Sequence, residues 1–251
     1  MNKLRLISRL DIKSPNLVKG RQFEGLRKIG DPNDFAIKYY EEGIDEIFYE
    51  DIVASLYERN SLVDIIEKTS ENIFVPLTVG GGLRTIKDVS DVLKAGADKV
   101  AINTAAIKDP NFISEVSNKF GSQCMILSIQ AKKRENGWEA LYDNGREKSN
   151  LDVIEWAIKG EKNGAGEIIL TSVDNDGMGN GFDTELIKSV TNEIKVPVIV
   201  SGGMGKLTDV SNVIKSSNVD AVAIGRSLHY NTFSIKDIKE HCIKEGIQTR
   251  Y

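Results

Sequence analysis

Val75-Pro-Leu-Thr-Val-Gly-Gly-Gly82 recurs about 120 residues later as Val196-Pro-Val-Ile-Val-Ser-Gly-Gly203. Each copy is a short apolar run that ends in glycines, which is the pattern of a buried strand followed by a tight turn. Three further pairs keep this offset: Asp98-Lys-Val-Ala-Ile-Asn103 with Asp220-Ala-Val-Ala-Ile-Gly225, Gly43-Ile-Asp-Glu-Ile47 with Gly164-Ala-Gly-Glu-Ile168, and Leu10-Asp-Ile-Lys13 with Ile129-Gln-Ala-Lys132. A period this long is not that of a solenoid. It predicts two similar halves joined into one domain.

Eight strand-like runs alternate with amphipathic stretches along the chain. We expect strands at 4–11, 46–51, 75–79, 99–103, 125–130, 167–171, 196–201 and 221–225. Helical patterns occupy 34–42, 85–95, 109–120, 151–163 and 184–194. Such alternation is typical of a parallel sheet, and a closed (β/α)8 barrel usually has about 250 residues. The sequence therefore predicts an α/β protein, a TIM barrel with a two-fold internal repeat, as a single domain over 1–251.

Composition argues against several function classes. The chain has 33 Lys+Arg and 37 Asp+Glu, so a net charge of −4 gives it no electrostatic reason to bind nucleic acid or an anionic membrane. No apolar run is long enough to span a bilayer, and Arg5 and Arg9 interrupt the only N-terminal apolar stretch. Two cysteines give no disulfide framework, so we expect a cytoplasmic protein. The two histidines lack a metal-binding spacing, and we expect neither metal nor cofactor.

Glycines and small polar residues follow matched strands in both halves. Glycine lets backbone N–H groups approach a phosphate, and helix N-termini favour anions. In a barrel these loops share the C-terminal face, where active sites lie. Two matched copies predict two phosphate sites and a substrate with a phosphate at each end; the alternative is that the glycines only make turns. The expected residues are Gly81, Gly82, Asn103, Thr104, Gly177, Gly202, Gly203, Gly225 and Arg226. For Arg226, the sequence is equally compatible with phosphate binding and with an ordinary surface position.

The sequence resembles the HisF family, the cyclase subunits of imidazole glycerol phosphate synthase. The resemblance covers nearly the whole chain and rests on the repeats above together with Val18-Lys-Gly20, Gly30-Asp-Pro32, Asp51-Ile-Val-Ala-Ser55, Phe120-Gly-Ser-Gln123 and Gly181-Phe-Asp-Thr-Glu185. Single pieces are shared with the related isomerase family HisA. Together they are specific for HisF.

This resemblance implies a heterodimer with a glutaminase subunit that docks at the N-terminal face of the barrel. Ammonia from the glutaminase would pass through the barrel and attack a doubly phosphorylated ribulosyl-formimino intermediate. The implied products are imidazole glycerol phosphate and an aminoimidazole carboxamide ribotide. Two aspartates, at the ends of the first and fifth strands, act as general acid and base in the family.

The catalytic residues implied by the resemblance are incompletely present. Asp11 matches the first aspartate, Lys19 the lysine of the loop after the first strand, and Asp176 a supporting acid after the sixth strand. Gln130 stands where the second aspartate is expected, and the internal repeat independently aligns it with Asp11. An amide does not transfer a proton at neutral pH. General acid–base catalysis contributes about 10²–10⁴-fold, so cyclisation should suffer unless Asp11 does both jobs slowly.

A ring of charges is expected at the floor of the barrel. The resemblance implies an ammonia gate made of Arg5, Glu46, Lys99 and Glu167. Strand parity supports it, since every second residue of a strand faces the same way. Ordinary salt bridges at the strand entries are the alternative. Asp98 would lie at the same end and face the glutaminase.

Two further charges share the inward-facing parity. Arg9 lies between Arg5 and Asp11 on the first strand, and Glu50 follows Glu46 on the second. Because an unpaired buried charge costs several kcal/mol, we predict an ion pair between Arg9 and Glu50 inside the barrel. The alternative is that Glu50 reaches solvent and Arg9 pairs only with Asp11.

Three functions are compatible with these residues. The first is a HisF cyclase. The second is a HisF-like component that delivers glutamine-derived ammonia to a sugar amidotransferase in acetamidino-sugar synthesis for surface glycans. The third is a non-enzymatic activator of a glutaminase. All three require a glutaminase partner, and they differ in what happens at the C-terminal face.

Overall fold

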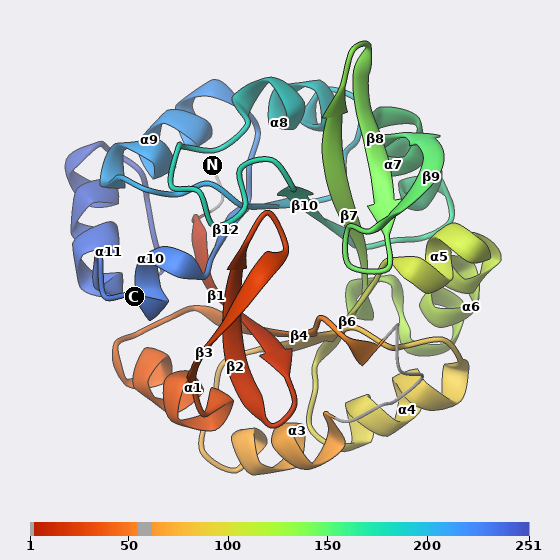
Figure 1. Ribbon diagram of the computed structural model, residues 1–251, viewed down its shortest axis with the longest axis horizontal. Coiled ribbons are helices and arrows are strands. Elements are labelled where there is room, and N and C mark those ends of the chain that lie inside the picture. Colours follow the sequence, from red (N-terminus) through yellow and green to blue (C-terminus); the bar gives the residue numbers. More distant parts are fainter. Residues whose placement is uncertain (1–2, 55–61, 251) are drawn as a thin grey trace.

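The computed structural model describes residues 3–54 and 62–250. Eight parallel strands close into a barrel in which β12 pairs with β1 and β7 pairs with β10. The predicted (β/α)8 barrel is therefore confirmed (Figure 1). Its strands, in order around the barrel, are β1 (Arg5–Lys13), β4 (Glu46–Asp51), β5 (Leu77–Gly80), β6 (Lys99–Ile102), β7 (Met125–Arg134), β10 (Glu167–Ser172), β11 (Val198–Ser201) and β12 (Ala221–Ile224).

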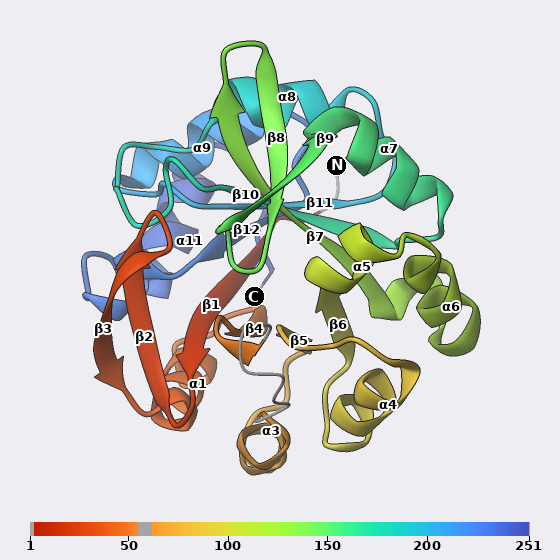
Figure 2. The same cartoon turned by 45° about the vertical axis from the view of Figure 1, so that its right-hand side comes forward.

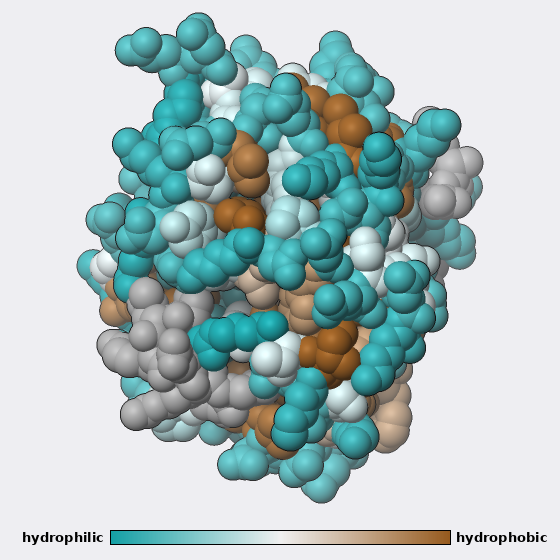
Figure 3. Space-filling model, turned by 90° about the vertical axis from the view of Figure 1, so that its right-hand side faces the viewer, coloured by the Kyte–Doolittle hydropathy of each residue, from teal (hydrophilic) through white to brown (hydrophobic). Residues whose placement is uncertain are grey.

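Helices surround the barrel and cover the outward-facing side chains of its strands (Figure 1). Each helix buries an apolar stripe; in α4, for example, Val89 and Val92 are fully buried. The side of the molecule drawn in Figure 3 is mostly hydrophilic, with separate apolar patches. The long helices are α1 (Pro32–Glu41), α3 (Val63–Ser70), α4 (Ile86–Lys94), α6 (Asn111–Phe120), α7 (Val153–Lys162), α8 (Thr184–Thr191), α9 (Leu207–Ser216) and α11 (Ile235–Lys244). Shorter ones are α5 (Thr104–Lys108), α10 (Arg226–His229) and the 3-10 turn η1 (Ser122–Cys124). No helix in the described ranges is long and apolar enough to cross a membrane.

Two antiparallel extensions were not expected from the sequence. β1 continues into β2 (Asn16–Arg21) and β3 (Glu24–Gly30), and β7 continues into β8 (Gly137–Tyr142) and β9 (Glu147–Asp152). Both rise from the barrel at its C-terminal end (Figure 2). Each extension pairs with its barrel strand at one of two positions that the repeat aligns, because Asp11 is opposite Val18 and Gln130 is opposite Leu141. Much of β3 and β9 is exposed and charged, so these strands lack the apolar runs that mark the barrel strands.

Several element boundaries differ from the predicted ones for local reasons. β5 and β11 begin after Pro76 and Pro197, because proline has no N–H for the ladder and supplies only its carbonyl, which accepts from Ile47 and Ile168. The helix expected from 151 begins at Val153, since the two preceding residues still pair with β8.

The barrel interior is layered. Above the floor lies an apolar layer from seven strands: Ile7, Phe48, Ala101, Ile126, Ile169, Ile199, Ala221 and Ala223. The first six of these residues, together with Thr78 of β5, line a void of only about 10 Å³. This dry layer separates the charges of the floor from those of the upper barrel.

Gly166, just before β10, packs closely against the backbone of the turn η1. An alanine Cβ there would lie 2.1 Å from the Ser122 carbonyl oxygen, a contact that requires the backbone to move. We expect Gly166→Ala to lower the free energy of unfolding by about 2 kcal/mol or more. Gly43→Ala is the control in the other half, where the repeat aligns Gly43 with the nearby Gly164. The new Cβ meets nothing within 4 Å, but residue 43 has φ +84°, so about 1 kcal/mol is expected. Equal losses in urea unfolding would contradict the steric explanation.

Candidate active site

The four floor residues form one closed ring of alternating charge. Arg5 Nη1 lies 2.8 Å from Glu46 Oε1, and Arg5 also pairs with Glu167. Lys99 Nζ lies 3.2 Å from both carboxylates. Arg5 and both glutamates are buried, while Lys99 is partly exposed to an open groove at the N-terminal face. Two cations and two anions balance, which suits a buried ion cluster.

Asp98 has a structural contact that its sequence position did not suggest. It is exposed at the N-terminal end of β6, and its Oδ2 accepts a hydrogen bond of 2.8 Å from Leu77 N. Asp220, its counterpart in the repeat, accepts in the same way from Val198 N at 3.1 Å. One carboxylate oxygen of Asp98 therefore caps the start of β5.

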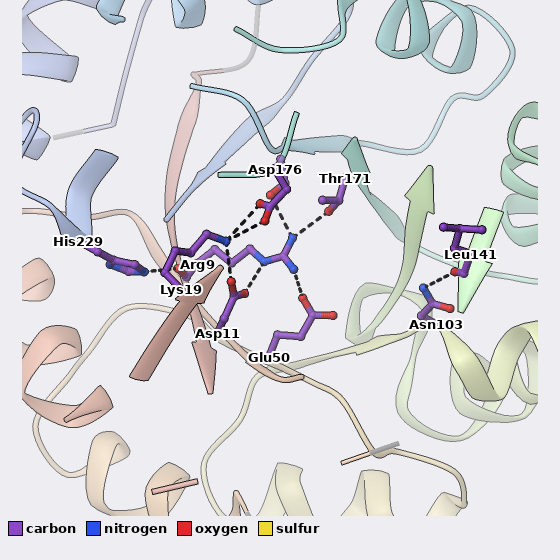
Figure 4. Close-up of polar contacts among 10 residues, drawn as sticks. Arg9, Asp11, Lys19, Glu50, Asn103, Leu141, Thr171, Asp176 and His229 are labelled. Carbon is purple, nitrogen blue, oxygen red and sulfur yellow. Dashed lines mark hydrogen bonds and ion pairs between the residues drawn. The ribbon is translucent and has the colours of Figure 1, made fainter. Parts of the chain in front are cut away.

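The upper barrel holds a second group of charges, centred on Arg9 (Figure 4). The predicted ion pair is present: Arg9 Nη2 lies 2.5 Å from Glu50 Oε2, and Glu50 is buried, not at a solvent-exposed rim. Arg9 Nε donates to Asp11 Oδ1 at 2.9 Å, and Nη1 donates to Thr171 Oγ1 at 2.9 Å and Ser201 Oγ at 3.2 Å. The guanidinium therefore joins four strands of the barrel across its interior.

Lys19 extends this group toward the loop after β10. Its ammonium donates to Asp11 Oδ2 at 2.6 Å and to both oxygens of Asp176 at 3.1 and 3.2 Å. All three side chains are buried. Around Lys19 the β2–β3 hairpin is tied to the same loop, because Gln22 N donates to Asp176 O at 2.8 Å. The structure thus brings Asp11, Lys19 and Asp176 together as the resemblance implied.

These contacts set the charge states. Burial alone would raise the pKa of the Asp11 carboxyl, but Lys19 and Arg9 hold this pKa well below its usual range. Burial opposes the charge of Lys19, yet Asp11 and Asp176 raise the ammonium pKa above its usual value. Asp11 is consequently a fixed carboxylate with a cation on each oxygen. It can accept a proton only against both cations.

His229 holds the backbone of Arg9 through a hydrogen bond, a contact that the sequence did not predict. Its Nε2–H donates to the backbone carbonyl of Arg9 at 3.0 Å, which leaves Nδ1 to accept from Tyr39 OH at 2.8 Å. Burial, together with the charge of Lys19, lowers the pKa of His229 to about 4. The imidazole is therefore neutral at pH 7 and acts as a hydrogen-bonded spacer between α1 and β1.

A cavity of about 490 Å³ opens at the C-terminal face beside Glu50. The first expected phosphate site lines it, namely Gly81, Gly82, Asn103 and Thr104, together with Gln130. The Gln130 side chain is 3% exposed, and none of the described residues hydrogen-bonds its amide. Two further buried amide oxygens at this cavity, Asn103 Oδ1 and Asn144 Oδ1, also lack a partner there. Uncommitted buried amides around a cavity are groups that a bound ligand would satisfy.

The second expected phosphate site is much smaller. Gly177, Gly202, Gly203, Gly225 and Arg226 surround a cavity of only about 20 Å³, the room of about one water molecule. Lys19 and Asp176 form its wall toward the barrel centre. The glycine loops of the two halves thus border two cavities that differ greatly in size. A phosphate can enter the second only if the surrounding loops separate.

At the N-termini of the two helices that follow the glycines, an aspartate of each helix already accepts the hydrogen bonds that we expected a phosphate to accept. Asp88 accepts from Arg84 N and Thr85 N at the start of α4, and Asp209 accepts from Gly205 N and Lys206 N at the start of α9. These carboxylates occupy the helix N-termini, where the helix dipole would otherwise favour a bound anion. The backbone N–H groups that these two carboxylates accept from are therefore not free for a phosphate. No His, Cys, Asp and Glu cluster suited to a metal ion occurs in residues 3–54 and 62–250.

Comparison with known proteins agrees with this architecture. The family model described as "Histidine biosynthesis protein" matches residues 5–234. A Legionella pneumophila protein named imidazole glycerol phosphate synthase subunit HisF is 57% identical over 210 residues, which cover 83% of this chain and 99% of the relative. Proteins of that name from Dehalococcoides mccartyi and Clostridium botulinum are each 43% identical, over 100% and 98% of this chain and 98% of each relative. The chain belongs to the HisF family.

Within this HisF protein, Arg9 is expected to be essential for folding. Its removal would leave Glu50 buried without a cation and Asp11 with Lys19 alone, so Arg9→Met should lower the free energy of unfolding by about 3 kcal/mol or more. The control is Arg146→Met, because Arg146 is exposed and the change there should fall within about 0.5 kcal/mol. Urea unfolding of both variants decides the matter, and similar small losses would refute a structural role for the buried guanidinium.

His229 should make the protein sensitive to mild acid. Between pH 6.5 and about 4 the unfolded chain protonates this histidine while the folded state does not, so stability falls as the pH falls. In His229→Gln the fall over this interval should be smaller by roughly 3 kcal/mol. Parallel stability–pH curves for wild type and His229→Gln would disprove this assignment.

Proposed function

We propose that this chain is the cyclase subunit of an imidazole glycerol phosphate synthase and takes its ammonia from a HisH-like glutaminase. Family membership over nearly the whole chain supports this function. The single observation that carries it within the structure is the cavity over Gly81 and Gly82, whose buried Gln130 amide has no partner among the described residues. The cavity lies next to Asp11, the expected catalytic carboxylate, because Asp11 and Glu50 are paired across β1 and β4.

The proposed glutaminase docks at the floor. The open groove there is about 700 Å³ and is lined by Arg5, Glu46, Lys99 and Glu167 together with Gln123 and Arg250. Ammonia released into this groove would cross the charged ring and then the apolar layer before it reaches Arg9. With a void of only about 10 Å³ in that layer, passage requires the side chains to move apart. Ring and layer together would keep water and ions out while a small neutral molecule passes.

At the C-terminal face, each group has a role that its geometry favours. The glycine backbone at 81–82, with Asn103 and Thr104, would hold one phosphate, and the smaller site beside Arg226 would hold the other once its loops separate. Asp11, kept ionised by Lys19 and Arg9, would supply a fixed negative charge next to the substrate. Lys19, carried on the β2–β3 hairpin, would close over the substrate.

One observation favours a second function. Gln130 cannot give or take a proton, so the barrel could retain ammonia delivery and lose cyclisation. The chain would then pass ammonia to a separate sugar amidotransferase in acetamidino-sugar synthesis. This alternative uses the floor in the same way and differs only in what the upper cavity binds.

Ammonia-dependent turnover of the ribulosyl-formimino intermediate separates the two functions. For the proposed cyclase, the wild-type protein should form both products with an ammonium salt as the nitrogen source. Gln130→Asp, which adds the missing carboxylate, should then change the rate by less than about tenfold. Negligible wild-type turnover that Gln130→Asp raises by about 10² or more would instead establish the loss of cyclisation and favour ammonia delivery.

A further inference from the structure

The two charged layers of the barrel differ in their balance. At the floor, two cations face two carboxylates. In the upper barrel, two cations, Arg9 and Lys19, face three carboxylates, Asp11, Glu50 and Asp176. All five upper side chains are buried. A buried cluster with an uncompensated negative charge relieves it by taking up a proton.

The contacts of the three carboxylates identify where that proton goes. Asp11 has a cation on each oxygen, and Asp176 has both oxygens within 3.2 Å of the Lys19 ammonium. Glu50 has one contact, from Oε2 to Arg9, and no described residue contacts its other oxygen (Figure 4). Glu50 is therefore the least compensated of the three.

Glu50 is also the one that faces the ligand cavity. It lines the large cavity together with Gln130, whereas neither Asp11 nor Asp176 contributes to this lining. The strand on its other side, β5, carries no charged residue. Charged side chains that line the rest of the cavity are Asp51, Arg84, Lys108, Asp109 and Glu115. Acidic residues outnumber basic ones in this set, so the set does not neutralise the negative charge of a Glu50 carboxylate.

We infer that Glu50 is the group that gives and takes a proton in this cavity, where Gln130 cannot, with Arg9 as the residue that positions it. Burial raises the pKa of the Glu50 carboxyl above its usual value, although Arg9 opposes this effect. The inference deepens the proposed cyclase function and rests on it for the identity of the substrate.

The proton transfer balances over one condensation. Addition of ammonia to the ketone of the ribulosyl group forms a C–N bond and leaves an oxyanion and an ammonium on the same carbon. Protonated Glu50 gives its proton to the oxyanion, becomes a carboxylate that Arg9 neutralises, and takes one proton from the ammonium, which yields the neutral carbinolamine. Glu50 then protonates the hydroxyl, the C–O bond breaks to release water, and the iminium nitrogen returns a proton to Glu50. Glu50 ends in its starting state, and one water is released for each ammonia consumed.

Infrared spectroscopy tests the proton on the free protein, without any substrate. At about pH 6.5, where ordinary carboxyl groups are ionised, the wild type should show the C=O stretching band of a protonated carboxyl. Glu50→Gln should remove this band. Glu46→Gln is the matched control, because it makes the same change on the same strand in the balanced floor ring, and the band should remain. No band in the wild type, or a band that survives Glu50→Gln, would overturn the inference.

The pH dependence of ammonia-dependent turnover tests the role in catalysis. Glu50→Gln should lower kcat by about 10²–10⁴-fold with little change in KM, and the inflection due to this acid should vanish from the pH–rate profile. Glu50→Asp keeps a carboxyl and should retain part of kcat together with the inflection. An unchanged kcat in Glu50→Gln would overturn the catalytic role while the proposed function stands. Absence of wild-type turnover would overturn the proposed function instead, and the infrared band would still decide the protonation of Glu50.

Discussion

The buried guanidinium of Arg9 is the contact on which the upper half of the barrel depends. It starts on β1 and reaches Glu50 on β4, Thr171 on β10 and Ser201 on β11. Asp11 owes one of its two cations to it. A neutral His229 fixes its backbone from outside the barrel. Because a charge in this position must be fully compensated, the identities of several neighbouring side chains follow from the presence of one arginine.

The separation of the two charged layers gives them different chemistry. The floor ring is neutral in sum, so its four groups can remain ionised and hold one another in place. The upper cluster has one carboxylate in excess and lies beside a ligand-sized cavity. An apolar layer lies between the two clusters, so no side chain of one contacts a side chain of the other in the described part of the chain.

Strand parity made the interior predictable from the sequence. Alternate residues of β1 face inward, so Arg5, Arg9 and Asp11 could be assigned to the barrel interior, and the adjacent strand supplied Glu46 and Glu50. Parity says nothing about contacts made by segments outside the strands. His229 lies on a four-residue helix with no periodic pattern, and its hydrogen bond to Arg9 spans 220 positions of the chain.

The glycine motifs mark two loops that border cavities, but they do not indicate the sizes of these cavities. The glycine motifs of the two loops are similar, and Lys19 of β2 lines only the smaller cavity. Whether a loop covers a site depends on its own tertiary contacts, such as that of Gln22 N with Asp176 O. A local motif does not contain this information.

The account as a whole depends on which carboxyl of the upper cluster holds the exchangeable proton. Carbon-13 NMR of the side-chain carboxyl carbons, followed from about pH 4 to pH 9 and assigned with Glu50→Gln and Asp176→Asn, measures this residue by residue. We predict that Glu50 shows an inflection above the usual range of about 4.3 for glutamate, while the Asp11 signal stays at its ionised position throughout. A Glu50 signal that titrates at or below the usual value, with the elevated inflection on Asp11, would contradict the account.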